Sequence, residues 1–265
     1  MNGGPAHPAY GVPRAVSPIA TVLLEENPSE MTLEGTNTWL LRARGAGEHV
    51  VVDPGHDDPP HLDRLVAAGP VALVLLTHRH PDHAEGARSF AARVGAPVRA
   101  FDPALCLEGP PLADGEVVTA AGLDIEALHT PGHTADSVSL RVPYGDATHV
   151  LTGDTVLGRG TTVLDDLGAY LRSLRRLVGL PAGTLGLPGH GPELPDLAAT
   201  ARAYTEHREQ RLDQVRAALR RLGAGASARQ IVELVYADVD RVLWGPAEAS
   251  VLAQLDYLRA EGEIP

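Results

Sequence analysis

The chain has 265 residues, of which 44% are hydrophobic, and its formal net charge is −12. This length and composition predict a globular protein with one large domain, or with one large and one small domain. The acidic balance disfavours non-specific binding to nucleic acid, and the single cysteine, Cys106, excludes an internal disulfide and a cysteine-based zinc site.

The N-terminal region shows no export or membrane signal. Its only apolar run, residues 19–24, is too short for a secretory segment, and no stretch approaches the roughly 20 apolar residues that a membrane span requires. A cytoplasmic location without a membrane partner is therefore the default expectation. Residues 1–18 begin with a Pro- and Gly-rich stretch without periodicity and are expected to form a flexible arm.

Residues 19–200 combine predicted strands with predicted helices. Strands are expected at 19–25, 36–42, 49–53, 71–76, 97–101, 116–119, 123–129, 137–142 and 148–153. Helices are expected at 59–68, 83–94 and 166–178, where apolar residues recur at helical spacing. Strands followed by a helix, twice over, favour an α/β fold with an internally repeated αβ/βα sandwich.

Residues 201–265 are expected to form a second, small domain, because strand patterns stop and helical periodicity continues. Helices are expected at 197–222, as one helix or two, at 227–236 and at 247–260, with breaks at 223–225 and 244–246. With a short strand-like end at 263–264, these helices look like a winged-helix domain.

The charge of this tail decides between two roles for it. Winged helices bind DNA in many proteins, but the tail holds nine arginines against ten acids, so packing on the first domain is favoured over DNA binding. A solvated helix face is expected for Arg202, Arg208, Arg211, Arg216, Arg220 and Arg221.

The densest group of functional side chains follows the predicted strand 71–76, in the stretch His78-Arg79-His80-Pro81-Asp82-His83. Loops at the ends of such strands are where α/β proteins place their chemistry. Three imidazoles and a carboxylate within six residues would be badly solvated as core, and both groups are ligands that zinc accepts. We therefore predict a metal site here, in preference to a chance His-rich surface loop.

Three further residues each follow a strand-like apolar stretch: His133, Asp154 and His190. Together with the H-x-H-x-D-H motif they resemble the metallo-β-lactamase superfamily in kind and order. The resemblance implies a four-layer αβ/βα sandwich with two metals at its rim. It places His78, His80 and His133 on one metal, Asp82, His83 and His190 on the other, and Asp154 between them.

Asp53 leaves two interpretations open. It closes the predicted strand 49–53, where its carboxylate could hydrogen-bond the metal loop and orient a ligand. It could equally cap the turn that follows.

A closer resemblance is to the beta-lactamase-like protein 2 group. It rests on residues 27–40, residues 153–163 and the helical tail, and it extends from about residue 19 onward. Ser29-Glu30 departs from the Pro-Gly that is common in that group, which puts the conformation of this loop in question. The group includes single-strand-specific endoribonucleases and acyl-carrier thioesterases.

The resemblance implies a hydrolase with two zinc ions, although a site of N and O ligands also accepts iron or manganese. A hydroxide that bridges the metals would be the nucleophile, oriented by Asp82. Because the predicted catalytic domain carries most of the negative charge, an acyl thioester or ester is expected ahead of single-stranded RNA. A non-hydrolytic, metal-sensing DNA-binding regulator is the remaining alternative.

Overall fold

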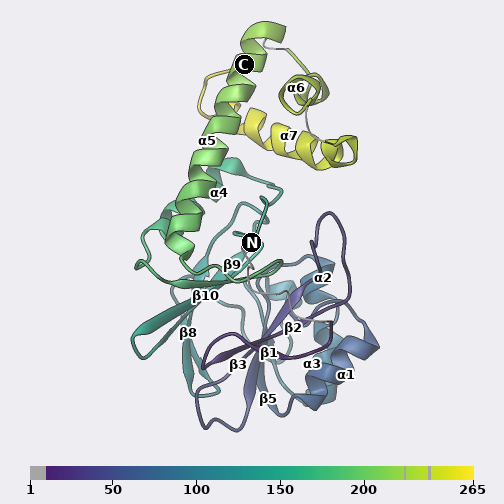
Figure 1. The fold of residues 1–265 in the computed structure, drawn as a ribbon, viewed down its shortest axis with the longest axis vertical. Coiled ribbons are helices and arrows are strands. Elements are labelled where there is room, and N and C mark those ends of the chain that lie inside the picture. The colour runs from purple at the N-terminus through teal and green to yellow at the C-terminus, as the bar shows by residue number, and fades with distance from the viewer. Residues whose placement is uncertain (1–9, 224, 238–239) are drawn as a thin grey trace, which may run out of the picture.

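A computed structural model describes residues 10–223, 225–237 and 240–265. Within them, two β-sheets are flanked by helices, and three helices at the C-terminal end form a group beyond the sheets (Figure 1). The predicted fold class is confirmed, namely an α/β four-layer sandwich with a small helical domain. In the same residues, no helix combines the length and apolar character needed to cross a bilayer.

The first sheet contains six strands in chain order. They are β1 (Arg14–Ala15), β2 (Ala20–Leu24), β3 (Asn37–Leu41), β4 (His49–Val52), β5 (Val71–Leu75) and β6 (Val98–Arg99). Strands β1 to β4 pair antiparallel, whereas β4, β5 and β6 are parallel. The C-terminal ends of β4 and β5 therefore lie at the same edge of the sheet.

The second sheet contains five strands in the order β11-β10-β9-β8-β7. They are β7 (Val117–Ala120), β8 (Leu123–His129), β9 (Val138–Tyr144), β10 (Ala147–Gly153) and β11 (Leu185–Pro188). All neighbours are antiparallel except β10 and β11. That parallel pair brings the residues after β10 and after β11 to one edge.

The helices fall into three groups. Beside the first sheet lie α1 (Pro59–Ala67), α2 (Pro81–Ala84), α3 (Ala87–Val94) and the short 3-10 helix η1 (Pro103–Leu105). On the second sheet lie α4 (Leu167–Val178) and the start of α5 (Leu197–Leu222). The tail adds α6 (Ala228–Val235), the 3-10 helix η2 (Arg241–Leu243) and α7 (Trp244–Ala260).

Alternating strand residues build the layers, because successive side chains point to opposite faces of a sheet. In β5, Val74 packs with α1 and α3, whereas Leu73 and Leu75 face the second sheet. In β10, Leu151 faces the first sheet and Val150 packs with α4 and the tail. Three buried apolar clusters thus separate four layers.

Two local predictions need correction. The expected helix 83–94 is divided into α2 and α3 at Gly86, where a Cβ atom would lie 2.4 Å from the carbonyl oxygen of His56. Within the expected arm, Arg14–Ala15 form β1, and the Arg14 guanidinium donates two hydrogen bonds to Glu193. The arm prediction for residues 1–9 lies outside the described residues.

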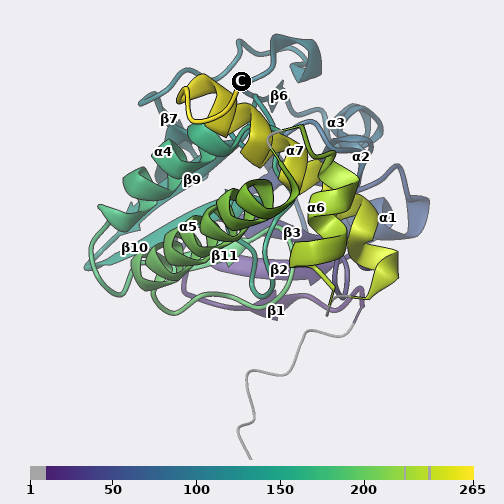
Figure 2. The same ribbon diagram turned by 90° about the horizontal axis from the view of Figure 1, so that it is seen from above.

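The tail also differs from prediction in three places. Residues 244–246 begin α7 and do not interrupt the helices, because proline is tolerated in a first helical turn. Residues 263–264 form no strand, and the Glu263 carboxylate instead accepts hydrogen bonds from Arg216. Arg208, expected on a solvated face, is buried. Helix α7 packs against α4, α5 and α6 (Figure 2).

Candidate metal centre

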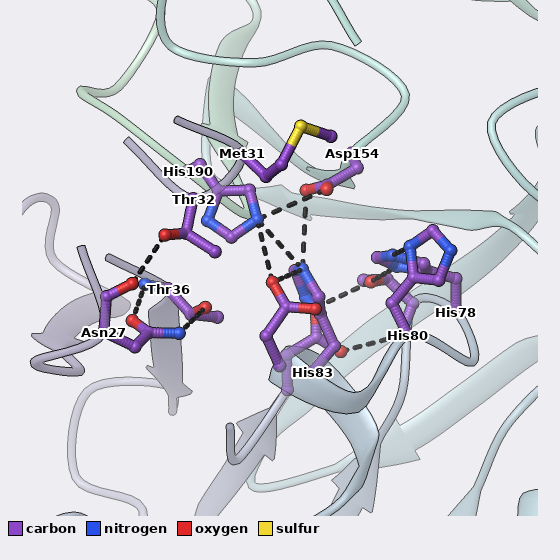
Figure 3. Close-up of polar contacts among 12 residues, drawn as sticks. Asn27, Met31, Thr32, Thr36, His78, His80, His83, Asp154 and His190 are labelled. Atoms are coloured by element: carbon purple, nitrogen blue, oxygen red, sulfur yellow. Dashed lines mark hydrogen bonds and ion pairs between the residues drawn. The ribbon is translucent and has the colours of Figure 1, made fainter. Parts of the chain in front are cut away.

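The seven predicted ligands come from four segments that meet at the ends of strands. His78, His80, Asp82 and His83 follow β5, and His133 follows β8. Asp154 directly follows β10, and His190 lies two residues beyond β11. Figure 3 shows several of these side chains turned toward one another. The topology of both sheets thus concentrates imidazoles and carboxylates in one place.

A first group of three imidazoles comprises His78, His80 and His133. Nδ1 of His80 lies 3.1 Å from Nε2 of His78 and 3.0 Å from Nε2 of His133. One nitrogen of each ring lies within 4.8 Å of those of the other two, so a single ion could contact all three.

A second group comprises Asp82, His83 and His190. Nε2 of His190 lies 3.2 Å from Oδ2 of Asp82 and 3.3 Å from Nε2 of His83. These three ligand atoms also lie within 4.8 Å of one another. Both imidazoles are fully buried, whereas Asp82 reaches the surface of the site.

Asp154 lies between the two groups. Its Oδ2 is 3.7 Å from Nε2 of His133 and 3.3 Å from Nε2 of His190, and its Oδ1 is 3.5 Å from Nε2 of His83. Oδ1 is buried and has no hydrogen-bond partner among the described residues. Gly189 leaves room for it, because a Cβ atom there would lie 2.5 Å from Oδ1.

Four of the five imidazoles are oriented by a hydrogen bond from the ring nitrogen that points away from the cluster. His83 Nδ1 donates to Asp53 Oδ2 at 2.9 Å, and His78 Nδ1 donates to the Thr77 hydroxyl at 3.0 Å. Carbonyl oxygens accept from the other two: Val163 from His133 Nδ1 at 2.8 Å and Gly35 from His190 Nδ1 at 3.1 Å.

These bonds assign the tautomers, so in a neutral ring the nitrogen that faces the cluster carries a lone pair. Lone pairs that converge at 3.0–3.7 Å on each other and on carboxylates repel unless a cation lies between them. This arrangement and the orphaned oxygen of Asp154 fit a metal site.

The pKa directions of Asp154 and His190 indicate that the buried carboxylates favour positive charge beside them. Burial raises the pKa of Asp154, but the imidazoles of His190 and His83 outweigh it and hold that pKa well below its usual range. Burial lowers the pKa of His190, whereas Asp154 and Asp82 raise it, to about 9 overall. The pKa of His78 falls, because burial and the nearby His83 disfavour its charged form. Bound divalent ions would compete with protons for these nitrogens.

Asp53 hydrogen-bonds the loop that carries the candidate ligands, which favours the first of its two interpretations. Its Oδ1 accepts from the backbone N–H of Thr77 at 2.8 Å. Its Oδ2 accepts from the Thr77 hydroxyl at 2.6 Å and from His83 Nδ1 at 2.9 Å. The carboxylate therefore orients His83 directly and His78 through Thr77.

We predict that Asp53→Asn weakens metal binding by about 10–100-fold, the usual effect of losing a partner that orients a ligand. An amide nitrogen at either position would meet a donor where the carboxylate now accepts. Chelator competition with the purified variant measures the affinity. Asp57→Asn is the matched control, since Asp57 is exposed in the same loop. Equal metal affinity in wild type and Asp53→Asn would show that Asp53 only shapes the turn.

The loop before β3 closes one side of the site. The Ser29 hydroxyl accepts hydrogen bonds from the backbone N–H groups of Met31 and Thr32, so this loop is ordered without the Pro-Gly of the resembled group. Met31 is half exposed at the mouth of the site (Figure 3). No sequence pattern pointed to Met31, since a lone methionine in a polar loop is not distinctive.

A second loop, residues 157–163, supports His133 and is held by α5. The Tyr204 hydroxyl donates to the Gly160 carbonyl at 2.7 Å and accepts from the backbone N–H of Leu157 at 3.2 Å. Arg208 donates to the Thr162 carbonyl. These tail residues therefore position the loop whose Val163 carbonyl orients His133.

Comparisons with known proteins agree with this arrangement. The model of the metallo-beta-lactamase superfamily matches residues 31–190, and that of the beta-lactamase associated winged helix domain matches residues 227–264. A Drosophila melanogaster protein named beta-lactamase-like protein 2 homolog is 33% identical over 90% of this chain and 87% of its own length. An Aspergillus chevalieri protein named atrochrysone carboxyl ACP thioesterase is 32% identical over 91% of this chain and 82% of its own.

Two solved structures share the fold over almost the whole chain. A beta-lactamase domain protein from Burkholderia ambifaria superposes with a TM-score of 0.80 at 23% identity, covering 98% of this chain and 91% of its own. A metallo-beta-lactamase family protein from Thermus thermophilus gives a TM-score of 0.74 at 24% identity, covering 94% and 95%. The tail is therefore part of a shared architecture.

Proposed function

This chain belongs to the metallo-beta-lactamase superfamily and is a metal-dependent hydrolase of that fold, and we propose that it holds two divalent ions and cleaves an acyl thioester or a related ester. The observation that carries the proposal is the convergence of imidazole nitrogens and carboxylate oxygens from four segments, with the outer nitrogens of four rings already hydrogen-bonded.

One ion would be held by His78, His80 and His133, and the other by Asp82, His83 and His190. Asp154 would contact both ions, since its two oxygens face both groups. Zinc is the first choice for these ligands, and iron or manganese would also be accepted. Such ions supply a coordinated water with a pKa lowered toward about 7 and polarise the carbonyl under attack.

Asp82 is the chain's own candidate for handling the proton. Burial raises its pKa, but the hydrogen bond with His190 and the charges of His83 and His190 lower it, to about 2 overall. The carboxylate is therefore ionised at neutral pH and accepts a hydrogen bond from an attacking water. It also lines the open mouth, where substrate enters.

The cavity at the mouth of the site is large enough to surround a small acyl group. It encloses about 250 Å³ and is lined by candidate ligand side chains together with Asp165, Met31 and Val163, of which the last two supply apolar surface. Met31 and Val163 would contact an acyl chain there, with Asp82 beside the scissile bond.

Two observations support a thioester ahead of RNA. Residues 1–200 hold 13 arginines against 24 acids, and this negative net charge opposes the non-specific attraction of nucleic acid. A relative that matches 91% of this chain is named as an acyl-carrier-protein thioesterase.

A substrate panel tests the proposal. We expect zinc-loaded protein to hydrolyse acyl thioesters and to leave labelled single-stranded RNA intact. Asp82→Ala is expected to lower thioester turnover by about 10²-fold or more, since it removes a proton acceptor and a ligand together. Metal-dependent RNA cleavage that disappears in Asp82→Ala, without thioester turnover, would reverse the order of the two substrates.

A further inference from the structure

A cavity of about 210 Å³ lies between α5, α7 and the loop at residues 161–163. It adjoins the candidate metal centre, because Val163 lines both the cavity and the mouth of the site. The neighbouring Thr162 also lines the cavity, and its hydroxyl lies 2.9 Å from Nδ1 of His133. A ligand group in the cavity would therefore lie beside the loop that supports His133.

Within residues 10–223, 225–237 and 240–265, the charged side chains that line this cavity are cationic. They are Arg208 and Arg211, with His207 beside them, and no acidic side chain of those residues lines it. Arg208 is only 4% exposed, and its Nε has no hydrogen-bond partner in the described part of the chain. Such a group is unusual in a protein with a net charge of −12.

Among the described residues, the hydrogen-bond and ring partners of Arg208 and Arg211 are neutral. Arg208 donates to the Thr162 carbonyl and lies 5.4 Å from the centre of the Tyr170 ring. Arg211 donates to Gln214 at 3.0 Å and lies 4.6 Å from the centre of the Tyr236 ring. None of these contacts neutralises a guanidinium. Leaving the charge of the buried Arg208 unpaired is unfavourable, whereas Arg211 is only partly buried.

The electrostatic field in the cavity is positive because the charges of Arg208 and Arg211 are not neutralised. The pKa of His207 is lowered, first by burial and then by the charges of Arg208 and Arg211. A bound anion would offset these charges and complete the hydrogen bonding of Arg208. Two guanidinium groups beside the hydroxyls of Thr161 and Ser250 are well suited to a phosphate, which arginine binds through paired N–H donors.

We infer that this cavity binds the phosphate group of a thiol that carries the acyl substrate, as in a phosphopantetheine arm. The inference rests on the proposed thioester hydrolysis. The cavity is smaller than the roughly 300–1,000 Å³ of pockets that hold a whole drug-sized ligand, so it fits one charged group of a longer molecule. RNA would need cations spaced along a groove, whereas these are confined to one cavity.

Binding is tested first, independently of turnover, with 4′-phosphopantetheine and pantetheine, which differ only by the phosphate. Calorimetry on the metal-loaded protein is expected to show about tenfold or tighter binding of the phosphorylated thiol. Arg211→Gln is expected to remove most of that preference. Arg220→Gln is the matched control, since Arg220 is exposed on the same helix outside the cavity. Arg211 donates its hydrogen bond to Gln214 and not to the loop at residues 157–163, so metal content is expected to stay unchanged.

Kinetic measurements then test whether the bound phosphate belongs to the substrate. Arg211→Gln should raise KM for an acyl-coenzyme A about tenfold and leave KM for the same acyl group on N-acetylcysteamine unchanged. Equal binding of the two thiols by wild type, or an unchanged preference in Arg211→Gln, would overturn the inference. Tighter binding of a short single-stranded RNA that depends on Arg211 would also overturn it. An Arg211-dependent phosphate preference without thioester turnover would keep the anion site and reject the proposed function.

Discussion

Asp154→Asn is expected to lose metal from both positions and to lower kcat/KM by at least about 10³-fold, which corresponds to about 4 kcal/mol. Asp154 is the only proposed ligand whose two oxygens approach imidazoles of both groups, at 3.3–3.7 Å. An amide keeps one oxygen, removes the negative charge and turns an N–H donor toward nitrogens that already face inward. Both ions would therefore be held less tightly.

His190→Ala is the comparison that makes this result specific. His190 approaches Asp82 and His83 but belongs to only one of the two groups, so its loss should empty chiefly one position. Elemental analysis after dialysis measures both variants. Asp146→Asn, an exposed change in the turn between β9 and β10, is the matched control. Full occupancy with normal activity in Asp154→Asn would remove the bridging role.

The candidate ligands could be singled out in the sequence because four of them lie close together and the others each follow a strand-like stretch. His78, His80, Asp82 and His83 lie within six residues after an apolar strand, and the other three each follow a strand of their own. An orienting role of Asp53 was one of two interpretations open in the sequence, but the other distant groups that orient the rings could not be predicted, because they lie far away in the chain. The carbonyl groups of Gly35 and Val163 accept from rings 155 and 30 residues away.

The tail also shows that side-chain environments set by distant segments could not be predicted from sequence. Helical periodicity located α5, α6 and α7, but charge pattern alone placed Arg208 on a solvated face. Arg208 is buried because the loop at residues 161–163 folds against α5 and offers a carbonyl to its guanidinium. A helix pattern cannot report which loop will cover it, so the cationic cavity emerged only from the fold.

Deleting residues 201–265 is expected to give an aggregated or inactive protein. We propose the domain division after residue 200, although α5 runs through it from Leu197. One buried apolar cluster joins the tail to the second sheet and α4, including Val150, Leu164, Leu174, Leu212, Val215, Ile231, Val251, Leu255 and Leu258. A module of about 65 residues is marginal alone, and exposing each large side chain costs roughly 1.5–3 kcal/mol.

The metal centre should fail together with the packing, because the deletion also removes Tyr204 and Arg208. Without them the loop at residues 157–163 loses the bonds that place the Val163 carbonyl against His133.

A 1–226 fragment keeps α5 but lacks α6 and α7, so it separates loss of packing from loss of the loop contacts. It should expose apolar surface and retain more metal than the 1–200 fragment. Tyr204→Phe, which removes one hydroxyl and keeps the ring, is the mildest comparison and should lower metal affinity without aggregation. Light scattering, metal content and thioester turnover are measured on each protein, and a soluble, fully active 1–200 fragment would refute the dependence of the site on the tail.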